Sequence, residues 1–366
     1  MGRVTINDVA EKAQVSVGTV HRAIYGKAGV SKVVWERILE IASELNYHPN
    51  RVASPLRKKP LNIVIAFPEP SSDNRYFYGR LWNACKEERE LFDSHNCNVI
   101  QLPYDDKEAG SFVSDISRIL LQYKNSIDGM LIGGKIWSEN ILLATQIYED
   151  PYNVPLITIG EDFDNINCLA SIQSDHISDG RMAAELLCTY MHDGGDILLF
   201  GGDITMHSNR ENATAFEQYV NTYYPEHKIY KVFGDSADHS IPDRVAALLQ
   251  EKTEIRGMYS VSARGTMHVV DGLKRSGIKE NIKIIGSDLY QETADYLRNG
   301  QIQSIIYKNP QKQARVGIHL LMDYLLWGNR PVNQRQRLTS IIVNRANVDR
   351  YFPASAELEL EEMENI

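Results

Sequence analysis

The fold of the N-terminal region is decided by residues 4–22, which read VTINDVAEKAQVSVGTVHR. Thr5 followed by Asp8 is a capping-box pattern, and apolar residues recur behind it at helical spacing, which predicts a helix of about eight residues. Ser16, after a tight turn, can cap a second short helix, and Ser31 can cap a third. Three short helices with a tight turn between the first two predict a helix-turn-helix unit.

The charge of the chain divides near Pro60. The whole chain has 39 Lys and Arg, 48 Asp and Glu and a net charge of −9. The segment from Met1 to Pro60 contains 10 basic and 5 acidic side chains, a net +5, so the remainder holds 29 against 43, a net −14. Because phosphate contacts need cations, this division favours contact with a polyanion through the N-terminal segment only. From charge alone, a chance uneven distribution of the charged residues along the chain remains an alternative explanation.

Composition excludes several classes of protein. A chain of 366 residues with 43% hydrophobic residues is long enough for two or three domains with a substantial core. Its four cysteines form no Cys-x-x-Cys pair, so we expect buried free thiols, no metal site and no cofactor. The N-terminus lacks an apolar signal region and no run of about 18 apolar residues occurs, so we expect a cytoplasmic protein.

The pattern changes beyond Pro60. Residues 46–60 are polar, contain three prolines and end in a cationic run, which marks a linker. Short apolar strands then alternate with amphipathic helices, one of them around residues 81–92. Strands are predicted at residues 63–67, 99–102, 130–132, 156–159, 197–200, 229–233, 258–260, 282–285 and 304–306. This alternation predicts α/β layers with parallel sheets, and the number of units favours two lobes.

Four motifs follow one another at fixed spacing between Val4 and Arg57: VTINDVA from Val4, VSVGTVHR from Val15, VS from Val30 and LNYHPNRVA from Leu45. Together they resemble the DNA-binding headpiece of the lactose-repressor/galactose-repressor (LacI/GalR) family. The α/β remainder is similar in pattern to that family's sensor, which resembles periplasmic sugar-binding proteins. The resemblance implies a headpiece at 1–48, a hinge at 49–60, a two-lobed effector-binding and dimerisation domain at 61–350 and an acidic tail at 351–366.

The resemblance also implies which headpiece residues contact DNA. Val17 and Gly18 would face base edges in the major groove, but direct readout would fall mainly on His21 and Arg22, one turn further on. Other polar residues would contact phosphates, although helix capping is an equal alternative for two of them, Ser16 and Ser31. The headpiece residues predicted to contact DNA are Thr5, Ser16, Val17, Gly18, Thr19, His21, Arg22 and Ser31.

Residues 50–58 correspond to the family's hinge helix, in which the resemblance assigns DNA contacts to Asn50, Arg51, Ala53 and Leu56. Leu56 stands at the position of a leucine that wedges into the minor groove and kinks the duplex. Pro55 cannot donate a backbone hydrogen bond, which favours a late or irregular start of this helix.

Two further departures from the family concern the headpiece itself. Gln14 replaces the glycine that the family usually has in a left-handed turn, and Gly18 inside a helix costs about 1 kcal/mol relative to alanine. We therefore expect a headpiece that is less stable alone than is usual for the family.

The resemblance to ribose-type binding proteins implies an effector site made of aromatic and polar residues. Its predicted members are Arg75, Tyr76, Phe77, Glu161, Arg210, Ser262, Asp288 and Lys308. Alternatives stay open: Asp288 could cap the next helix, Arg210 could pair with Glu211 or another carboxylate, and Tyr76 and Phe77 could belong to the core.

The sequence Gly160-Glu161-Asp162 stands where the family often has an Asp-Arg pair, which weakens the prediction of an ordinary pentose or hexose. If Arg75, Arg210 and Lys308 converge, an acidic or phosphorylated sugar becomes a reasonable effector, because guanidinium groups bind carboxylate and phosphate bidentately.

The combined prediction is a homodimeric transcription regulator, a repressor of a carbohydrate-uptake or catabolic operon, with no membrane association. Its partners would be palindromic double-stranded operator DNA and a small carbohydrate or sugar-derivative effector. One rival class is an enzyme, but the phosphate-loop, nucleophile-elbow and His-Glu-x-x-His motifs are absent from the sequence. The other rival is a sugar-binding protein without a DNA role, which the complete headpiece opposes.

Overall fold

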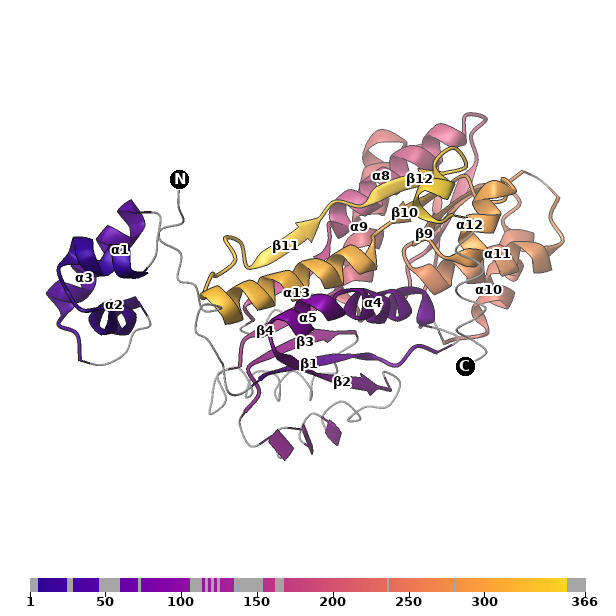
Figure 1. Cartoon of the computed structure of the whole chain (residues 1–366). Coiled ribbons are helices and arrows are strands. Elements are labelled where there is room, and N and C mark those ends of the chain that lie inside the picture. The colour runs from indigo at the N-terminus through magenta and orange to yellow at the C-terminus, as the bar shows by residue number, and fades with distance from the viewer. Residues whose placement is uncertain are drawn as a thin grey trace. The chain divides into compact units, whose positions relative to one another are not determined.

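The computed structural model of the chain (Figure 1) describes residues 6–24, 29–45, 60–71, 74–105, 114–115, 118–119, 122–123, 126–134, 154–161, 168–235, 237–279 and 281–353. The chain divides into two compact units, one of which contains Met1–Pro60 and the other Leu61–Leu321. None of the helices in the described ranges is long and apolar enough to cross a membrane.

The first unit contains the predicted helix-turn-helix, which is confirmed. Its helices are α1 (Ile6–Ala13), α2 (Val17–Ile24) and α3 (Lys32–Glu44). They pack around a small apolar core formed by Val9, Ala10, Ala13, Val20, Ala23, Ile38 and Ala42. The turn between α1 and α2 passes through Gln14, whose φ of 52° lies in the left-handed region, as the family's glycine position predicts.

The second unit begins with a lobe built on a parallel sheet, which we call the first lobe. The described strands of its six-stranded sheet follow the order β11-β5-β4-β3-β1-β2. Their bounds are β1 Leu61–Pro68, β2 Cys97–Tyr104, β3 Gly129–Gly133, β4 Leu156–Ile159, β5 Ala170–Ser174 and β11 Arg335–Leu338. Among the described residues, the helices of this lobe are α4 (Arg75–Glu87), α5 (Arg89–Ser94) and α13 (Pro310–Trp327), the last of which belongs to the second unit as far as Leu321. Helix α13 approaches the sheet closely at Gly317, beside Ile157 and Ile159.

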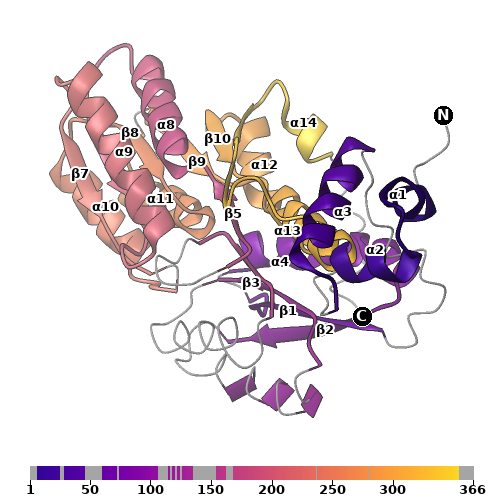
Figure 2. The ribbon, with the colours of Figure 1, turned by 90° about the vertical axis from the view of Figure 1, so that its left-hand side faces the viewer.

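The second lobe is built on another six-stranded sheet, whose described strands follow the order β12-β10-β9-β8-β6-β7. Their bounds are β6 Asp196–Phe200, β7 Ile229–Val232, β8 Ile255–Ser260, β9 Lys283–Ser287, β10 Ser304–Tyr307 and β12 Ile341–Asn344. One apolar core joins the sheet to α8 (His176–Tyr190) and α9 (His207–Tyr223). Another joins it to α10 (Ile241–Glu251), α11 (Ala263–Ser276), α12 (Gln291–Arg298) and α14 (Val348–Tyr351), so helices cover both faces (Figure 2).

The chain passes between the two lobes three times, according to the order of the described strands. These passages lie between β5 and α8, between β10 and α13, and between β11 and β12. Each passage is short, so residues just before and after it from different parts of the sequence meet at the junction of the lobes.

The predicted α/β architecture with two lobes is confirmed, with some corrections. Each predicted strand overlaps an observed one, but the helix predicted around residues 81–92 is divided into α4 and α5. Strand β12 pairs with β10 in the antiparallel direction, so the second sheet is not wholly parallel. The four cysteines are free thiols, as expected, but Cys97 is only partly buried.

Candidate functional site

A cleft lies at the carboxyl ends of the strands of both sheets, where α/β proteins bind ligands. It holds about 890 Å³ of space, part of which is open to solvent. Residues directly following β3, β4, β6, β7, β8, β9 and β10 contribute to its lining. The lining is formed by Asn74, Tyr76, Phe77, Tyr78, Gly134, Ile159, Gly160, Glu161, Ser174, His176, Gly202, Asp203, Met206, Ser208, Asn209, Gly234, Asp235, Ser262, Ala263, Arg264, Asp288, Lys308 and Gln313.

An aromatic wall stands at the start of α4. The Tyr76 ring packs on the Tyr290 ring of the second lobe, with centroids 4.2 Å apart, and the Tyr290 hydroxyl donates to the Ala263 carbonyl. The Phe77 ring lies against the backbone of Gly160, whose φ of 86° and lack of a side chain allow this approach. Both Tyr76 and Phe77 therefore line the cleft rather than belonging only to the core.

Glu161 links the two lobes from a buried position in the lining of the cleft. It follows β4, is only 6% exposed, and its carboxylate accepts hydrogen bonds from the backbone N–H and the hydroxyl of Ser208. Ser208 lies in the first turn of α9, so the carboxylate of one lobe caps a helix of the other. Burial raises the pKa of Glu161 to about 7, and the hydrogen bonds from Ser208 oppose that rise.

Asp288 and Lys308 form a second buried polar group at the ends of β9 and β10. Asp288 has a left-handed φ of 62°, and its carboxylate accepts from the Lys308 backbone N–H at 3.3 Å. The Lys308 ammonium donates to the Val261 carbonyl at 2.7 Å. Burial raises the pKa of Asp288, and the charge of Lys308 opposes the rise. Asp288 does not cap the next helix, because the N-cap of α12 is Tyr290.

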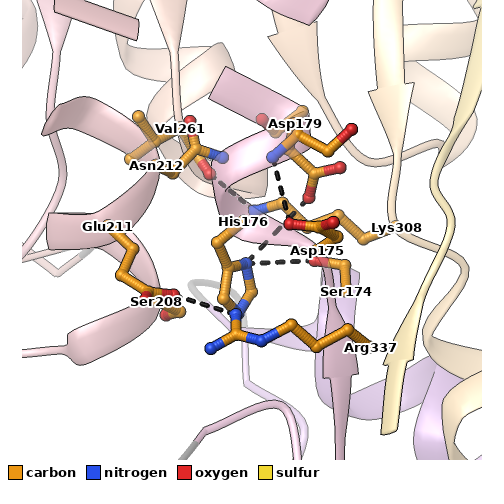
Figure 3. Close-up of polar contacts among 12 residues, drawn as sticks. Ser174, Asp175, His176, Asp179, Ser208, Glu211, Asn212, Val261, Lys308 and Arg337 are labelled. Atoms are coloured by element: carbon orange, nitrogen blue, oxygen red, sulfur yellow. Dashed lines mark hydrogen bonds and ion pairs between the residues drawn. The ribbon is translucent and has the colours of Figure 1, made fainter. Parts of the chain in front are cut away.

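A third polar group lies at the passage from β5 to α8 (Figure 3). His176 Nδ1 is 3.0 Å from the Ser174 hydroxyl and 4.0 Å from the Asp179 carboxylate. Burial lowers the pKa of His176 well below its usual range, and the nearby charges of Lys308 and Arg337 lower it further. Burial raises the pKa of Asp179 to about 6, against the effect of Lys308. His176 is therefore a neutral imidazole near pH 7.

Two buried side-chain atoms of the lining that can accept a hydrogen bond have no partner within the described part of the chain. They are His176 Nε2 and Gln313 Oε1. The amide nitrogen of Gln313 donates to the Lys308 carbonyl at 2.9 Å, so only its oxygen is left over. Buried polar atoms without partners are unfavourable, and a bound ligand is one way to satisfy them.

The three predicted cations do not converge. Lys308 lines the cleft, but Arg75 and Arg210 are exposed and lie outside the lining. The Arg75 guanidinium pairs with Glu292 at 2.9 Å, and that of Arg210 donates to the Ile204 carbonyl at 3.0 Å.

The register of α9 explains the position of Arg210. Asn212, two residues further along the helix, is fully buried and accepts from the Tyr259 hydroxyl at 2.8 Å. Residues two apart on a helix point to different faces, so Arg210 faces solvent. Arg210 pairs with no carboxylate in the described contacts, whereas Glu211 accepts from Arg337.

Six of the eight predicted effector residues line the cleft, namely Tyr76, Phe77, Glu161, Ser262, Asp288 and Lys308. Sequence reasoning missed Ser174, His176, Ser208, Asn209, Arg264 and Gln313, which also line it. Ser174 and His176 flank the end of a strand that was not predicted. Because that strand was not predicted, the prediction contained no passage from strand to helix at which to look for them.

The candidate nucleic-acid interface is the exposed N-terminal end of α2. The Ser16 hydroxyl accepts from the Thr19 N–H at 3.1 Å, so Ser16 caps the helix. Val17 and Gly18 are exposed beside it, and the exposed Arg22 side chain donates to the Gly18 carbonyl at 3.2 Å.

Ser31 is exposed just before α3. The side chain of His21 lies outside the described part of the structure, as do the predicted contacts Thr5, Asn50, Arg51, Ala53 and Leu56.

Comparison with known proteins agrees with both parts of this arrangement. Residues 5–50 match the family of bacterial regulatory proteins, lacI family, and residues 152–329 match the periplasmic binding protein domain. Catabolite control protein A of Staphylococcus epidermidis is 28% identical over 211 residues, which cover 56% of this chain and 57% of that protein. The HTH-type transcriptional regulator DegA of Bacillus subtilis is 26% identical over 208 residues, covering 57% and 58%. These alignments span less than two thirds of the relatives' length.

Solved structures resemble the α/β region. A putative LacI transcriptional regulator from Bacteroides fragilis superposes with a TM-score of 0.69 at 17% identity, over 80% of this chain and 100% of that one. A periplasmic ribose ABC transporter protein from Conexibacter woesei also gives a TM-score of 0.69 at 17% identity, over 81% and 96%. At this level of identity the likeness establishes the fold.

The chain therefore joins a helix-turn-helix domain to a two-lobed binding-protein fold. The first matches the lacI family of bacterial regulatory proteins, the second matches a periplasmic binding protein domain, and relatives of similar sequence include an HTH-type transcriptional regulator.

Proposed function

We propose that this chain is a sequence-specific DNA-binding transcription regulator, a repressor of a carbohydrate-uptake or catabolic operon, whose DNA affinity is set by a small effector in the cleft. The observation that carries the proposal is one chain holding both a lacI-family helix-turn-helix with an exposed α2 end and a two-lobed cleft with buried polar groups. Neither an enzyme nor a transport protein needs a helix-turn-helix.

The proposed DNA contacts follow from the surface of α2. Ser16 and Thr19, whose hydroxyls are 2.9 Å apart, contact phosphate oxygens, while Arg22 reads a base edge in the major groove. His21 and Ser31 add headpiece contacts. Leu56 of the hinge wedges into the minor groove, where unstacking one base step costs roughly a few kcal/mol that other contacts offset.

Effector control is proposed to act through the contacts that join the lobes. The Glu161 carboxylate bonds to Ser208, and Arg337 of the first lobe donates to Glu211 of the second at 3.0 Å. A ligand that favours one arrangement of the lobes would favour one arrangement of the attached headpiece, a coupling typically worth about 1–3 kcal/mol. We further propose a homodimer in the cytoplasm that binds a palindromic operator, since two-fold symmetry of protein and DNA match.

The proposal is tested by measuring affinity for duplex DNA at several salt concentrations, with fluorescence anisotropy and the full chain. Binding that weakens steeply with salt is expected, because phosphate contacts release counterions. Arg22→Ala should lower affinity and reduce the slope of log K against log salt by about one if a phosphate is also contacted. Arg89→Ala, which removes an exposed arginine of α5, is the matched control and should change neither. Binding that is absent or indifferent to salt would contradict the regulator assignment.

A further inference from the structure

The cleft concentrates buried negative charge. Within the described part of the chain, the buried side chains of Asp, Glu, Lys and Arg are Glu161, Asp179, Asp288 and Lys308. Glu161, Asp288 and Lys308 line the cleft, and Asp179 lies 4.0 Å from Nδ1 of His176, which also lines it. Asp179, His176 and Lys308 are drawn in Figure 3. Among the described residues, this region therefore contains three buried carboxyl groups and one buried ammonium group.

The neighbouring arginines have partners of their own, although Arg337 lies beside His176 (Figure 3) and its charge lowers the pKa of His176. Arg337 donates to Glu211 at 3.0 Å, and Arg75 pairs with Glu292 at 2.9 Å. Arg264 lines the cleft at its aromatic side, where its guanidinium donates to the Tyr76 hydroxyl at 3.4 Å. None of these contacts brings a guanidinium to the carboxylate of Glu161.

The hydrogen-bond donors that contact the Glu161 carboxylate are neutral groups. A buried carboxylate that is ionised would be stabilised more by a cation. Its bonds come from the N–H and hydroxyl of Ser208 and from the backbone N–H of His207, and the opposing effect of Lys308 on its pKa is the smallest of these contributions. Ionising a carboxyl group in such a place is unfavourable unless a positive charge accompanies it. Burial raises the pKa of Glu161 to about 7 and that of Asp179 to about 6, and the charge of Lys308 lowers both without cancelling the rise.

Besides the carboxyl groups, the lining contains hydrogen-bond acceptors on His176 and Gln313 that have no partner among the described residues. With a proton on Nδ1, which faces the Ser174 hydroxyl and the Asp179 carboxylate, His176 presents Nε2 as an acceptor. Gln313 presents its amide oxygen. The Lys308 ammonium uses one of its three N–H donors on the Val261 carbonyl. The acceptors on His176 and Gln313 that lack a partner in the described part of the chain suit this part of the cleft to a ligand that brings donors.

We propose that the effector is a small polyhydroxylated amine, whose ammonium group pairs with Glu161 and whose hydroxyl groups donate to His176 and Gln313. This inference rests on the proposed function, since it names the chemical class of the effector for the same cleft. The carbon skeleton packs on the Phe77 ring. A phosphorylated or carboxylated sugar would add negative charge beside three carboxyl groups, with Arg75 and Arg210 outside the cleft.

The test measures the melting temperature of the full chain at about pH 7, where simple alkyl ammonium groups are charged. The probes are matched pairs that differ by an amine and a hydroxyl: D-glucosamine with D-glucose, D-galactosamine with D-galactose, and 1-amino-1-deoxy-D-sorbitol with D-sorbitol. N-acetyl-D-glucosamine is the neutral amide control. We expect an amine to stabilise the protein more than its hydroxyl partner.

Two variants separate charge pairing from a merely structural role of Glu161. Glu161→Gln keeps an oxygen that can accept from Ser208 but removes the charge, so it should weaken binding of the amine about tenfold or more and bring it level with its partner. Glu292→Gln removes a carboxylate that joins the lobes outside the lining, and the preference for the amine should survive in it.

The proposal is overturned if no amine stabilises the wild-type chain more than its hydroxyl partner, or if the preference persists in Glu161→Gln. Because the first of these outcomes needs only the wild-type protein, the test stands even if a variant fails to fold. DNA binding plays no part in it. Salt-dependent DNA binding without a preference for amines would contradict only the effector class, and the reverse result would contradict only the regulator assignment.

Discussion

Gln14 illustrates how a single residue affects the headpiece. Its φ of 52° places an L-residue in the left-handed region, which costs roughly 1–2 kcal/mol relative to ordinary helical geometry. The backbone needs this conformation because the chain must turn sharply between α1 and α2, and the Val15 N–H bonds back to the Ala10 carbonyl across the turn. The sequence predicted both the turn and its conformation, since the family usually has glycine here.

Replacing Gln14 with glycine should stabilise the headpiece. We expect Gln14→Gly to raise the free energy of opening of α1 to α3 by about 0.5–1 kcal/mol, because the relief of strain exceeds the added flexibility of the unfolded chain. Amide hydrogen exchange of the full chain measures this quantity. Gln14→Ala is the control and should give no such gain; equal protection in the two variants would show that the left-handed turn is not a source of instability.

Glu161 should make stability depend on pH in a defined direction. Its pKa is about 7 in the folded protein because of burial, against an ordinary 4.5. Between these values the folded state holds the proton more tightly than the unfolded state, so stability is highest below about pH 4.5 and falls as pH rises through about 7. The free energy of unfolding should therefore fall by a few kcal/mol more in the wild type than in Glu161→Gln over this window.

Urea unfolding of both proteins at about pH 5 and about pH 8 gives the difference directly. Other titrating groups, such as Asp179, are common to the two proteins and largely cancel. The compared quantity is the free energy of unfolding of the wild type minus that of Glu161→Gln. If it stays constant between about pH 5 and about pH 8, or rises with pH, then Glu161 is ionised in the folded protein without cost.

At the scale of elements, the close packing of α8 on α9 positions the polar groups of the cleft. His176 and Asp179 lie on α8, while Ser208 and Asn212 lie on α9. The helices approach at Gly180, where a Cβ atom would overlap the Asn212 carbonyl oxygen and lie 2.9 Å from the Phe216 nitrogen. Only glycine fits between these backbones without displacing one of them.

Gly180→Ala should destabilise the second unit by about 1–3 kcal/mol, because the added methyl group meets backbone rather than a movable side chain. Gly79→Ala is the matched control: Gly79 lies in α4, and a Cβ there has no neighbour within 4 Å. That variant should gain about 0.5–1 kcal/mol from helix propensity alone. Thermal unfolding of both distinguishes the signs, and a neutral Gly180→Ala would show that α8 and α9 can separate freely.

The strands that could be predicted and those that were missed differ in composition. Continuous apolar runs such as residues 63–67 of β1 are buried on both faces and stand out in the sequence. Strand β5 is equally buried but reads ASIQS, and β11 at the edge of its sheet reads RQRL. Their stability comes from pairing with neighbours distant in the sequence, which no local pattern reports.

The candidate site was predictable where a residue follows an apolar strand. Glu161, Asp288 and Lys308 follow β4, β9 and β10, and all three line the cleft. Arg210 was misplaced because helical register, rather than proximity to a strand, determines which α9 side chain faces inward. The partnering of Glu161 with Ser208 could not be predicted, since it depends on how the two lobes meet.

At the scale of the whole molecule, the division of charge corresponds to the division of structure. The net +5 of the segment Met1–Pro60 belongs to the unit with the helix-turn-helix. That unit also takes in Met322–Arg330, which holds one Asp and one Arg, so the net −14 falls on the α/β unit. DNA would repel the second unit, so the headpiece and hinge must make nearly every favourable contact with phosphate. The same acidic excess reaches into the cleft, where buried carboxyl groups outnumber the buried ammonium of Lys308.

The most direct test of the central claim is to incubate the full chain with randomised duplex DNA, recover the bound fraction and sequence it. A dimeric regulator with this headpiece should enrich a palindromic site whose half-sites are separated by a fixed spacing, because two copies of α2 must enter successive major grooves. Arg22→Ala should reduce the enrichment. Recovery of DNA with no sequence preference, or of a single asymmetric motif, would contradict the account.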